Sequence, residues 1–190
     1  TNRDDWLLST NFGSGSVELF APGTDIYSTW YTTAEPYAVR SGTSMASPHV
    51  AGALALLKAE FPADTYRQLI NRLLRSTDPA PAFAGRVQTG GRLNLDRAIR
   101  SRDNRPFNDD FATRARVNGA NLAIRAVNTG ATTEAEPTIA GQPGGATLWW
   151  EWTPTTTGAV RVSTGGSSYD TLVGIFRGAA LDALTPVAAN

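Results

Sequence analysis

Apolar and polar positions follow a helical period in the first half of the chain. Between residues 44 and 60, apolar side chains recur at three- and four-residue spacing, and alanines fill most of the positions between them. A helix that is apolar nearly all round is normally buried, so this segment predicts a buried helix that ends before Pro62. We expect strands of a parallel sheet to cover it.

A second helix is predicted to begin near Asp64, which is a plausible N-cap. Its apolar stripe contains Tyr66, Leu69, Ile70, Leu73 and Leu74, and its polar face contains Arg67, Gln68, Asn71, Arg72 and Arg75. This division predicts a surface helix that packs by one face. On either side of the two helices, residues 17–23 predict a short strand ending in a Pro-Gly turn, and residues 90–100 predict an extended piece followed by a helical turn.

After about residue 101 the pattern changes to short runs that alternate between apolar and polar positions, separated by glycine turns. These runs predict strands at 147–154, 158–164 and 169–178. Short strands with frequent turns are typical of a β-sandwich. We therefore predict an all-β sandwich over 107–190, joined to a first domain over 1–100 by a polar linker at 101–106.

Three tryptophans lie close together in the first of these predicted strands. Alternation places Leu148, Trp150 and Trp152 on one side of the strand. We expect this side to pack in the core, because such strands need a buried face. A surface on which sugar rings stack is the alternative interpretation.

Composition narrows the classes of partner. Lys and Arg together number 17, as do Asp and Glu, so the net charge is zero and nothing favours a nucleic acid or an anionic membrane as partner. Cysteine is absent, which excludes disulfides, thiolate metal sites and a cysteine nucleophile. No run approaches the roughly 18 apolar residues of a membrane span. Neither end reads as a natural terminus, and no signal peptide begins the chain, so we expect a fragment.

The stretch SGTSMASPHVAG at 41–52 holds the strongest candidate for chemistry. Ser44 follows Gly42 and starts the first predicted helix, where free backbone N–H groups and partial positive charge are available. A serine there can attack a carbonyl while its own N–H helps to hold the oxyanion. A helix-capping serine is the structural alternative, and the chemistry alone favours it.

The string GTSMASPHVAG at 42–52 closely resembles the nucleophile motif of the subtilisin-like serine proteases, the subtilases of peptidase family S8. The resemblance implies that Ser44 is the nucleophile and that its N–H contributes to the oxyanion hole. It also implies supporting roles around the serine for Gly42, Thr43, Met45, Pro48 and His49. An Ala-Pro-Gly turn at 21–23 fits the same family. The resemblance covers about residues 1–100 and implies part of a three-layer α/β fold with a parallel sheet.

His49 is the only histidine of the chain, but helix geometry separates it from Ser44. Five residues along a helix place it about 140° around and about 7.5 Å along the axis, whereas a general base must lie within about 3.2 Å. Lys58 lies about 21 Å along the same helix. The resemblance implies that His49 is a structural residue, buried and hydrogen-bonded beneath the site.

A subtilase uses Asp, His and Ser in that chain order. Only 43 residues precede Ser44, and none of them is a histidine. We therefore expect the catalytic Asp and His and the oxyanion-hole Asn to belong to a missing N-terminal half of the catalytic domain. The parent is predicted to be a secreted serine endopeptidase that acts on protein or peptide substrates, and this chain alone is predicted to be inactive. Two alternatives are a non-catalytic binding or adhesion module with a remnant protease segment, and a Ser-Glu-Asp acid peptidase.

Residues 107–190 resemble the pre-peptidase C-terminal domains that follow the catalytic domain in many secreted bacterial peptidases. The resembling segments are PFNDDFATRARVNG, ATLWWEWTPTTTGAVRVST and YDTLVGIFRG. Asp109, Asp110 and Asp170 are candidate calcium ligands, although we favour solvated turn caps. Glu18 is a single acidic candidate beside the Ala-Pro-Gly turn. No cofactor is required for the predicted chemistry, and calcium is the one candidate structural ion.

Overall fold

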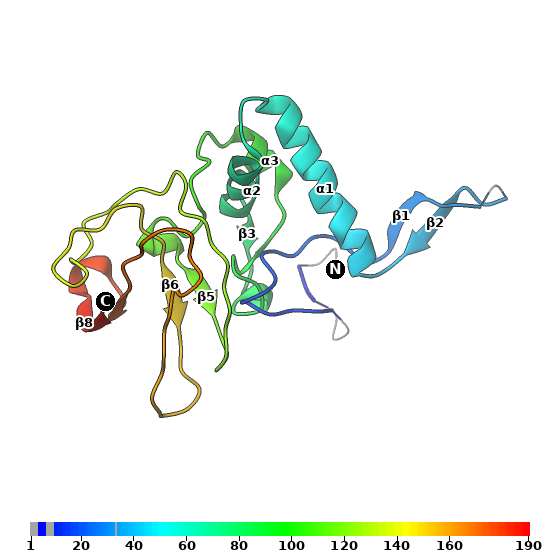
Figure 1. Cartoon of the computed structure of the whole chain (residues 1–190). Coiled ribbons are helices and arrows are strands. Elements are labelled where there is room, and N and C mark those ends of the chain that lie inside the picture. The colour runs from blue at the N-terminus through cyan, green and yellow to red at the C-terminus, as the bar shows by residue number, and fades with distance from the viewer. Residues whose placement is uncertain (1–3, 7–9, 33) are drawn as a thin grey trace.

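The computed structural model describes residues 4–6, 10–32 and 34–190. Three helices, α1 (Thr43–Glu60), α2 (Tyr66–Arg75) and α3 (Leu95–Arg100), form one group in the N-terminal part (Figure 1). The strands are β1 (Ile26–Thr29), β2 (Tyr37–Arg40), β3 (Asp78–Pro79), β4 (Gly91–Arg92), β5 (Ala115–Val117), β6 (Trp150–Trp152), β7 (Gly174–Arg177) and β8 (Thr185–Ala189). Three short 3₁₀ helices lie at Pro81–Phe83, Phe111–Thr113 and Leu181–Ala183. Among the described residues, no helix has the length and apolar character needed to cross a membrane.

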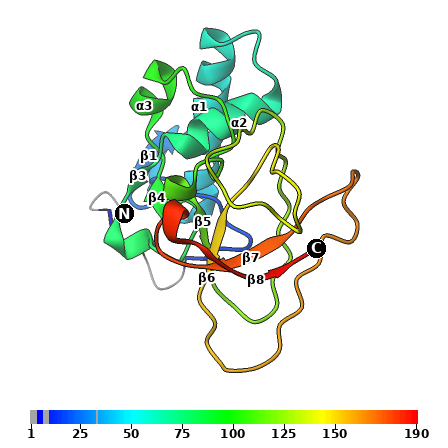
Figure 2. The ribbon, with the colours of Figure 1, turned by 90° about the vertical axis from the view of Figure 1, so that its left-hand side faces the viewer.

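The strands pair two by two. The pairs β1–β2, β3–β4 and β7–β8 are antiparallel, and β5–β6 is parallel. This mixture of helices and strands with a parallel pair is consistent with the expected α/β class, although the parallel pair lies mainly in the C-terminal part. Figure 2 shows the helices on one side of the molecule and β5 to β8 on the other. The β-sandwich is not confirmed, because β5 to β8 form two separate pairs.

Two predicted strands are wrong. Residues 158–164 form no strand, and Val160 and Val162 are 58% and 54% exposed because no described strand lies against them. Residues 17–23 contribute only one bridge, which joins Phe20 in parallel to Arg92 of β4. Alternation in the sequence indicates a two-faced segment, but a strand also needs a neighbour whose backbone groups are free to pair.

The hydrophobic core of the N-terminal part lies where the three helices meet. Its buried members are Ala53, Leu57, Leu69, Leu73 and Ala98. The helix predicted at 44–60 is confirmed as α1, but the expectation that it is buried all round is wrong. It packs by one face only, and Leu56 on the other side is 54% exposed. The covering strands that we expected are not among the described residues.

Helix α2 starts one residue later than predicted and buries a charge. Its N-cap is Thr65, which forms a capping box with Gln68. Asp64 instead pairs with Arg72 at 2.7 Å, and the two side chains are 14% and 4% exposed. Arg72 was predicted on the polar face, but the guanidinium lies 3.6 Å from the ring centre of Phe61 and also donates to the Ser101 carbonyl. The helix thus turns this arginine toward α3 and the linker.

Trp149 is the tryptophan that packs between the C-terminal segments. Its ring contacts Phe111 edge-on at 5.1 Å and Phe176 at 6.4 Å. Trp150 and Trp152 are each 37% exposed. The predicted inward face of Leu148, Trp150 and Trp152 is therefore wrong, since the partner strand β5 pairs edge-to-edge with β6 and leaves its two outer tryptophans uncovered.

An ionic cluster joins α2 to the linker and the C-terminal part. Arg75 donates to the Pro106 carbonyl at 2.7 Å and to Asp110 at 2.6 Å. Arg105 pairs with Asp103, Asp109 and Asp110. Asp109 is 1% exposed and also accepts the backbone N–H of Thr132 at 2.6 Å. Asp109 and Asp110 were predicted to be solvated turn caps or calcium ligands. Both carboxylates instead form ion pairs with arginine side chains.

This cluster predicts acid sensitivity. Burial raises the pKa of Asp103 and Asp110, but the hydrogen bonds and positive charges of Arg105 and Arg75 outweigh it and lower both pKa values. A carboxylate with a lowered folded pKa stabilises the fold above its unfolded pKa of about 3.9, and this contribution is lost as the pH falls through the folded value. We expect the free energy of unfolding to fall as the pH drops below about 4.

Urea unfolding of the wild type and of Arg105→Gln at several pH values checks this expectation. The variant lacks three of the ion pairs, so its free energy of unfolding should depend less steeply on pH. Arg100→Gln is the matched control, because Arg100 and Asp96 form a pair whose side chains are 77% and 70% exposed. Equal pH slopes for the wild type and Arg105→Gln would contradict the prediction.

Candidate active site

The loop before α1 is held by the Ala-Pro-Gly turn. The N–H of Gly42 donates to the Gly23 carbonyl at 2.7 Å, and Gly42 has a φ of +150°, which side chains other than hydrogen disfavour. A Cβ on Gly23 would lie 2.7 Å from the Gly42 carbonyl oxygen, so only glycine allows this approach. The turn and the loop thereby fix the position at which α1 begins.

Ser44 is the second residue of α1, and its side chain is exposed. The N-cap is Gly42, and no side chain caps the helix, so the alternative of a capping serine is wrong. Its hydroxyl and its backbone N–H have no hydrogen-bond partner among the described residues, while the N–H groups of Met45 and Ala46 bond to the Gly42 carbonyl. Ser44 therefore presents a free hydroxyl and a free N–H at the positive end of an 18-residue helix.

Pro48 lies early in α1, just after its first turn. It is the sixth residue of α1, so the N–H that it lacks is the one that would bond to the Ser44 carbonyl. The Ser44 carbonyl therefore receives no i+4 hydrogen bond from residue 48.

The other predicted supporting residues lie around this end of the helix. Thr43 is the first residue of α1 and is exposed, and Met45 is half-buried. His49 is exposed, which corrects the expectation that it is buried, since the strands expected over α1 are not among the described residues. Its predicted hydrogen bond is present, because Nδ1 donates to the Met45 carbonyl at 2.8 Å. That bond engages the ring with its own helix one turn back.

The β1–β2 hairpin, which precedes the Ser44 loop, was not predicted from the sequence. Strands β1 and β2 form a hairpin that projects from the body just before Gly42 (Figure 1). Tyr27 and Tyr37 stack across it with ring centres 5.6 Å apart. At its base, the Asp25 N–H donates to the Ser41 hydroxyl at 2.9 Å. The signal in the sequence is the β-branched and aromatic run IYSTWY at 26–31, a composition typical of strands.

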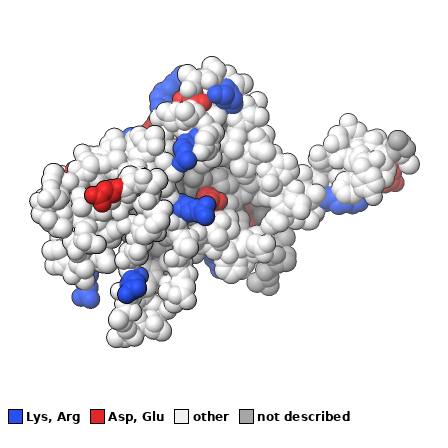
Figure 3. Space-filling model, in the orientation of Figure 1, with Lys and Arg blue, Asp and Glu red and all other residues white. Residues whose placement is uncertain are grey.

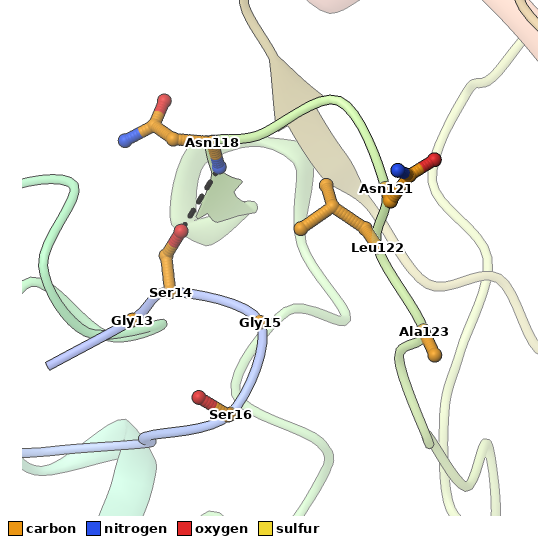
Figure 4. A pocket seen from close by; sticks show the side chains of 8 residues that line it. All are labelled: Gly13, Ser14, Gly15, Ser16, Asn118, Asn121, Leu122 and Ala123. Atoms are coloured by element: carbon orange, nitrogen blue, oxygen red, sulfur yellow. Dashed lines mark hydrogen bonds between the residues drawn. The ribbon is translucent and has the colours of Figure 1, made fainter.

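A small hollow of about 250 Å³ lies where the N-terminal part meets the segment after β5 (Figure 4). The backbone N–H of Asn118 donates to the buried Ser14 hydroxyl at 2.9 Å. Leu122 points toward the loop that contains Gly15, while the Asn118 and Asn121 side chains point away. None of the residues that line this hollow is ionisable, so it offers no acid or base for catalysis.

Calcium ligands are not assembled within the described part of the chain. It contains no group of three or more His, Asp or Glu side chains that could hold a metal ion. Glu18 is exposed and accepts a hydrogen bond from Thr89 through its backbone carbonyl, while Asp170 is exposed and its side chain forms no hydrogen bond or ion pair with any described residue. These single carboxylates do not fit an ion that takes about 6–8 oxygen ligands.

Comparison with known proteins gives one family and several relatives. The family model described as the subtilase family matches residues 4–113. Subtilisin-like protease 1 of Plasmodium vivax is 40% identical over 98 residues, which are 50% of this chain and 15% of that protein. An extracellular serine proteinase of Thermus sp. is 44% identical over 80 residues, which are 42% of this chain and 19% of that protein. This chain is therefore similar to a minor part of each relative's length.

Among solved structures, the A-subunit of the AB5 toxin from E. coli is 34% identical, with a TM-score of 0.43. The match covers 46% of this chain and 28% of that chain.

Proposed function

The chain belongs to the subtilase family, and from that premise we propose that it is the serine-bearing part of a subtilisin-like serine endopeptidase. The observation that carries this proposal is the position of Ser44. It lies inside the matched segment, at the exposed start of α1, with no hydrogen bond to its hydroxyl among the described residues. A capping or packing serine would have its hydroxyl engaged.

In the proposed reaction, Ser44 Oγ attacks the carbonyl carbon of the scissile peptide bond. A histidine outside this chain accepts the hydroxyl proton and then gives it to the leaving amine, and an aspartate outside this chain orients that histidine. The free N–H of Ser44 donates to the oxyanion, together with an asparagine side chain from outside this chain. The α1 macrodipole favours the negative charge at the same point.

The neighbours of Ser44 have supporting roles under this proposal. Gly42 and its contact with Gly23 place the serine, and Pro48, which has no N–H, makes no i+4 hydrogen bond to the serine carbonyl. Thr43 and Met45 shape the wall beside it. His49 engages the Met45 carbonyl and does not take the proton of Ser44.

Because the proposed histidine, aspartate and asparagine lie outside this chain, the 190 residues alone are not expected to hydrolyse peptides. We propose that an N-terminal half of the catalytic domain supplies them and covers the exposed face of α1, where Leu56 now meets solvent. The protein and peptide substrates are those of the whole enzyme. The relatives include extracellular enzymes by name, which supports secretion of the parent.

Residues 107–190 are proposed as an accessory β-domain that is held to the catalytic part by the ionic cluster around Arg75 and Arg105. The proposed chemistry uses only side chains and backbone groups, so calcium would have a structural role.

The experiment that tests the proposed function is the Ser44→Ala substitution in the full-length protein, with hydrolysis of a peptide substrate as the readout.

A further inference from the structure

An open groove of about 550 Å³ runs between the α2–α3 region and residues 107–116. We call it the arginine groove, because four arginines line it: Arg75, Arg97, Arg114 and Arg116. No Asp or Glu is among its lining residues, all of which lie in the described part of the chain. A groove with this lining favours a negatively charged ligand.

Two of the four arginines are committed to the fold. Arg75 bonds to Pro106 and Asp110, as described above. Arg114 donates to Glu151 at 2.7 Å and to the Phe111 carbonyl at 3.0 Å. These two side chains contribute positive charge to the groove, but their donors are already used.

The other two have donors to spare. The Arg97 side chain is 54% exposed, and within the described part of the chain only its Nη1 is bonded, to the Thr77 carbonyl at 3.1 Å and to Asp78 at 3.4 Å. The Arg116 side chain is 61% exposed, and its Nε lies 3.7 Å from Glu151, beyond hydrogen-bond distance. Arg116 thus makes no hydrogen bond through its guanidinium to any described residue. A guanidinium with free donors can pair with a carboxylate through two parallel hydrogen bonds.

Apolar side chains also line the groove. Leu74, Pro79, Pro81 and Phe107 line the same groove. Arg97 comes from α3 and Arg116 from β5, so the two free guanidinium groups belong to separate elements. A compact anion such as phosphate would leave the apolar lining unused, whereas an extended chain can contact both kinds of group.

We propose that the arginine groove binds an acidic, extended peptide segment of a protein partner. Its carboxylates pair with Arg97 and Arg116, and its apolar side chains lie on Pro79 and Phe107. On the face of the molecule shown in Figure 3, basic and acidic side chains are interspersed. Binding in the arginine groove does not require peptidase activity, so its test is independent of the test of the proposed function.

The test is fluorescence anisotropy of the 190-residue chain with a labelled peptide of alternating glutamate and alanine. The matched peptide of alternating glutamine and alanine has the same length and no charge. We expect the glutamate peptide to bind about tenfold more tightly than the glutamine peptide, and the double variant Arg97→Gln/Arg116→Gln to lose about that factor. Arg100→Gln is the control, because Arg100 is an exposed arginine of α3 that does not line the groove. It should bind as the wild type does.

Equal affinity for the two peptides would overturn the proposal, as would an equal loss in Arg100→Gln. Heparin and inorganic phosphate are tested as competitors. Groove-dependent binding of either one without binding of the glutamate peptide would also overturn it. If circular dichroism shows that the double variant is unfolded, the comparison of the two peptides on the wild type decides the question.

Discussion

Ser44→Ala in the full-length protein is expected to lower kcat for peptide hydrolysis by about six orders of magnitude, the loss measured when the triad serine of subtilisin, a relative in this family, is removed. Under the proposed mechanism the hydroxyl of Ser44 forms the bond to the substrate, and no neighbouring side chain can replace it. KM should change little, because the lost bond forms in the transition state. The measurement is steady-state hydrolysis of a fluorogenic peptide.

The serine three residues later provides the matched control. Ser47→Ala changes another serine of α1, and helix geometry places residue 47 about 60° around the axis from residue 44 and about 4.5 Å further along, so its hydroxyl does not occupy the position of the Ser44 hydroxyl. We expect this variant to keep its activity within a few-fold. A Ser44→Ala protein with wild-type kcat would show that the nucleophile lies elsewhere.

The second large effect concerns stability and the buried pair of Arg72 and Asp64. Arg72→Met should lower the free energy of unfolding by about 3–5 kcal/mol, because Asp64 would stay largely buried without its arginine. The substitution also removes the hydrogen bond to the Ser101 carbonyl and the contact with the Phe61 ring. Urea unfolding followed by circular dichroism measures the change.

Two further variants separate charge from packing. Arg67→Met changes an exposed arginine of the same helix and should cost less than about 0.5 kcal/mol. The double variant Asp64→Leu/Arg72→Met removes both charges and should recover most of the loss, because an apolar pair leaves no unpaired charge. A loss below about 1 kcal/mol in Arg72→Met would contradict a buried ion pair.

Local signals in the sequence predicted the helices well. The apolar period of residues 44–60 identified α1 within one residue, and the pattern at 90–100 identified β4 and α3. The predicted start of α2 was one residue too early. Thr65 and Gln68 form the capping box, while the Asp64 carboxylate forms an ion pair with Arg72. A polar residue before a helix suggests a cap, but the sequence does not show which of two neighbours provides it.

Long-range contacts could not be predicted. Arg72 belongs by helical position to the polar face, but it is buried by its contacts with Phe61, Asp64 and Ser101. In the C-terminal part, alternation favoured Trp150 as a core residue, yet Trp149 packs on Phe111 because the 3₁₀ turn at Phe111–Thr113 lies on its side. For the site, the motif predicted the place of Ser44, while the contact between Gly23 and Gly42 required the fold.

The most direct test of the central claim is labelling with a fluorophosphonate, followed by mass spectrometry to identify the modified residue. The claim is that Ser44 is the nucleophile and that its base lies outside this chain. We predict an adduct on Ser44 in the full-length protein and no adduct in the 190-residue chain under the same conditions. An adduct on Ser44 in the 190-residue chain would contradict the claim about the base, and an adduct on any other serine of the full-length protein would contradict the claim about the nucleophile.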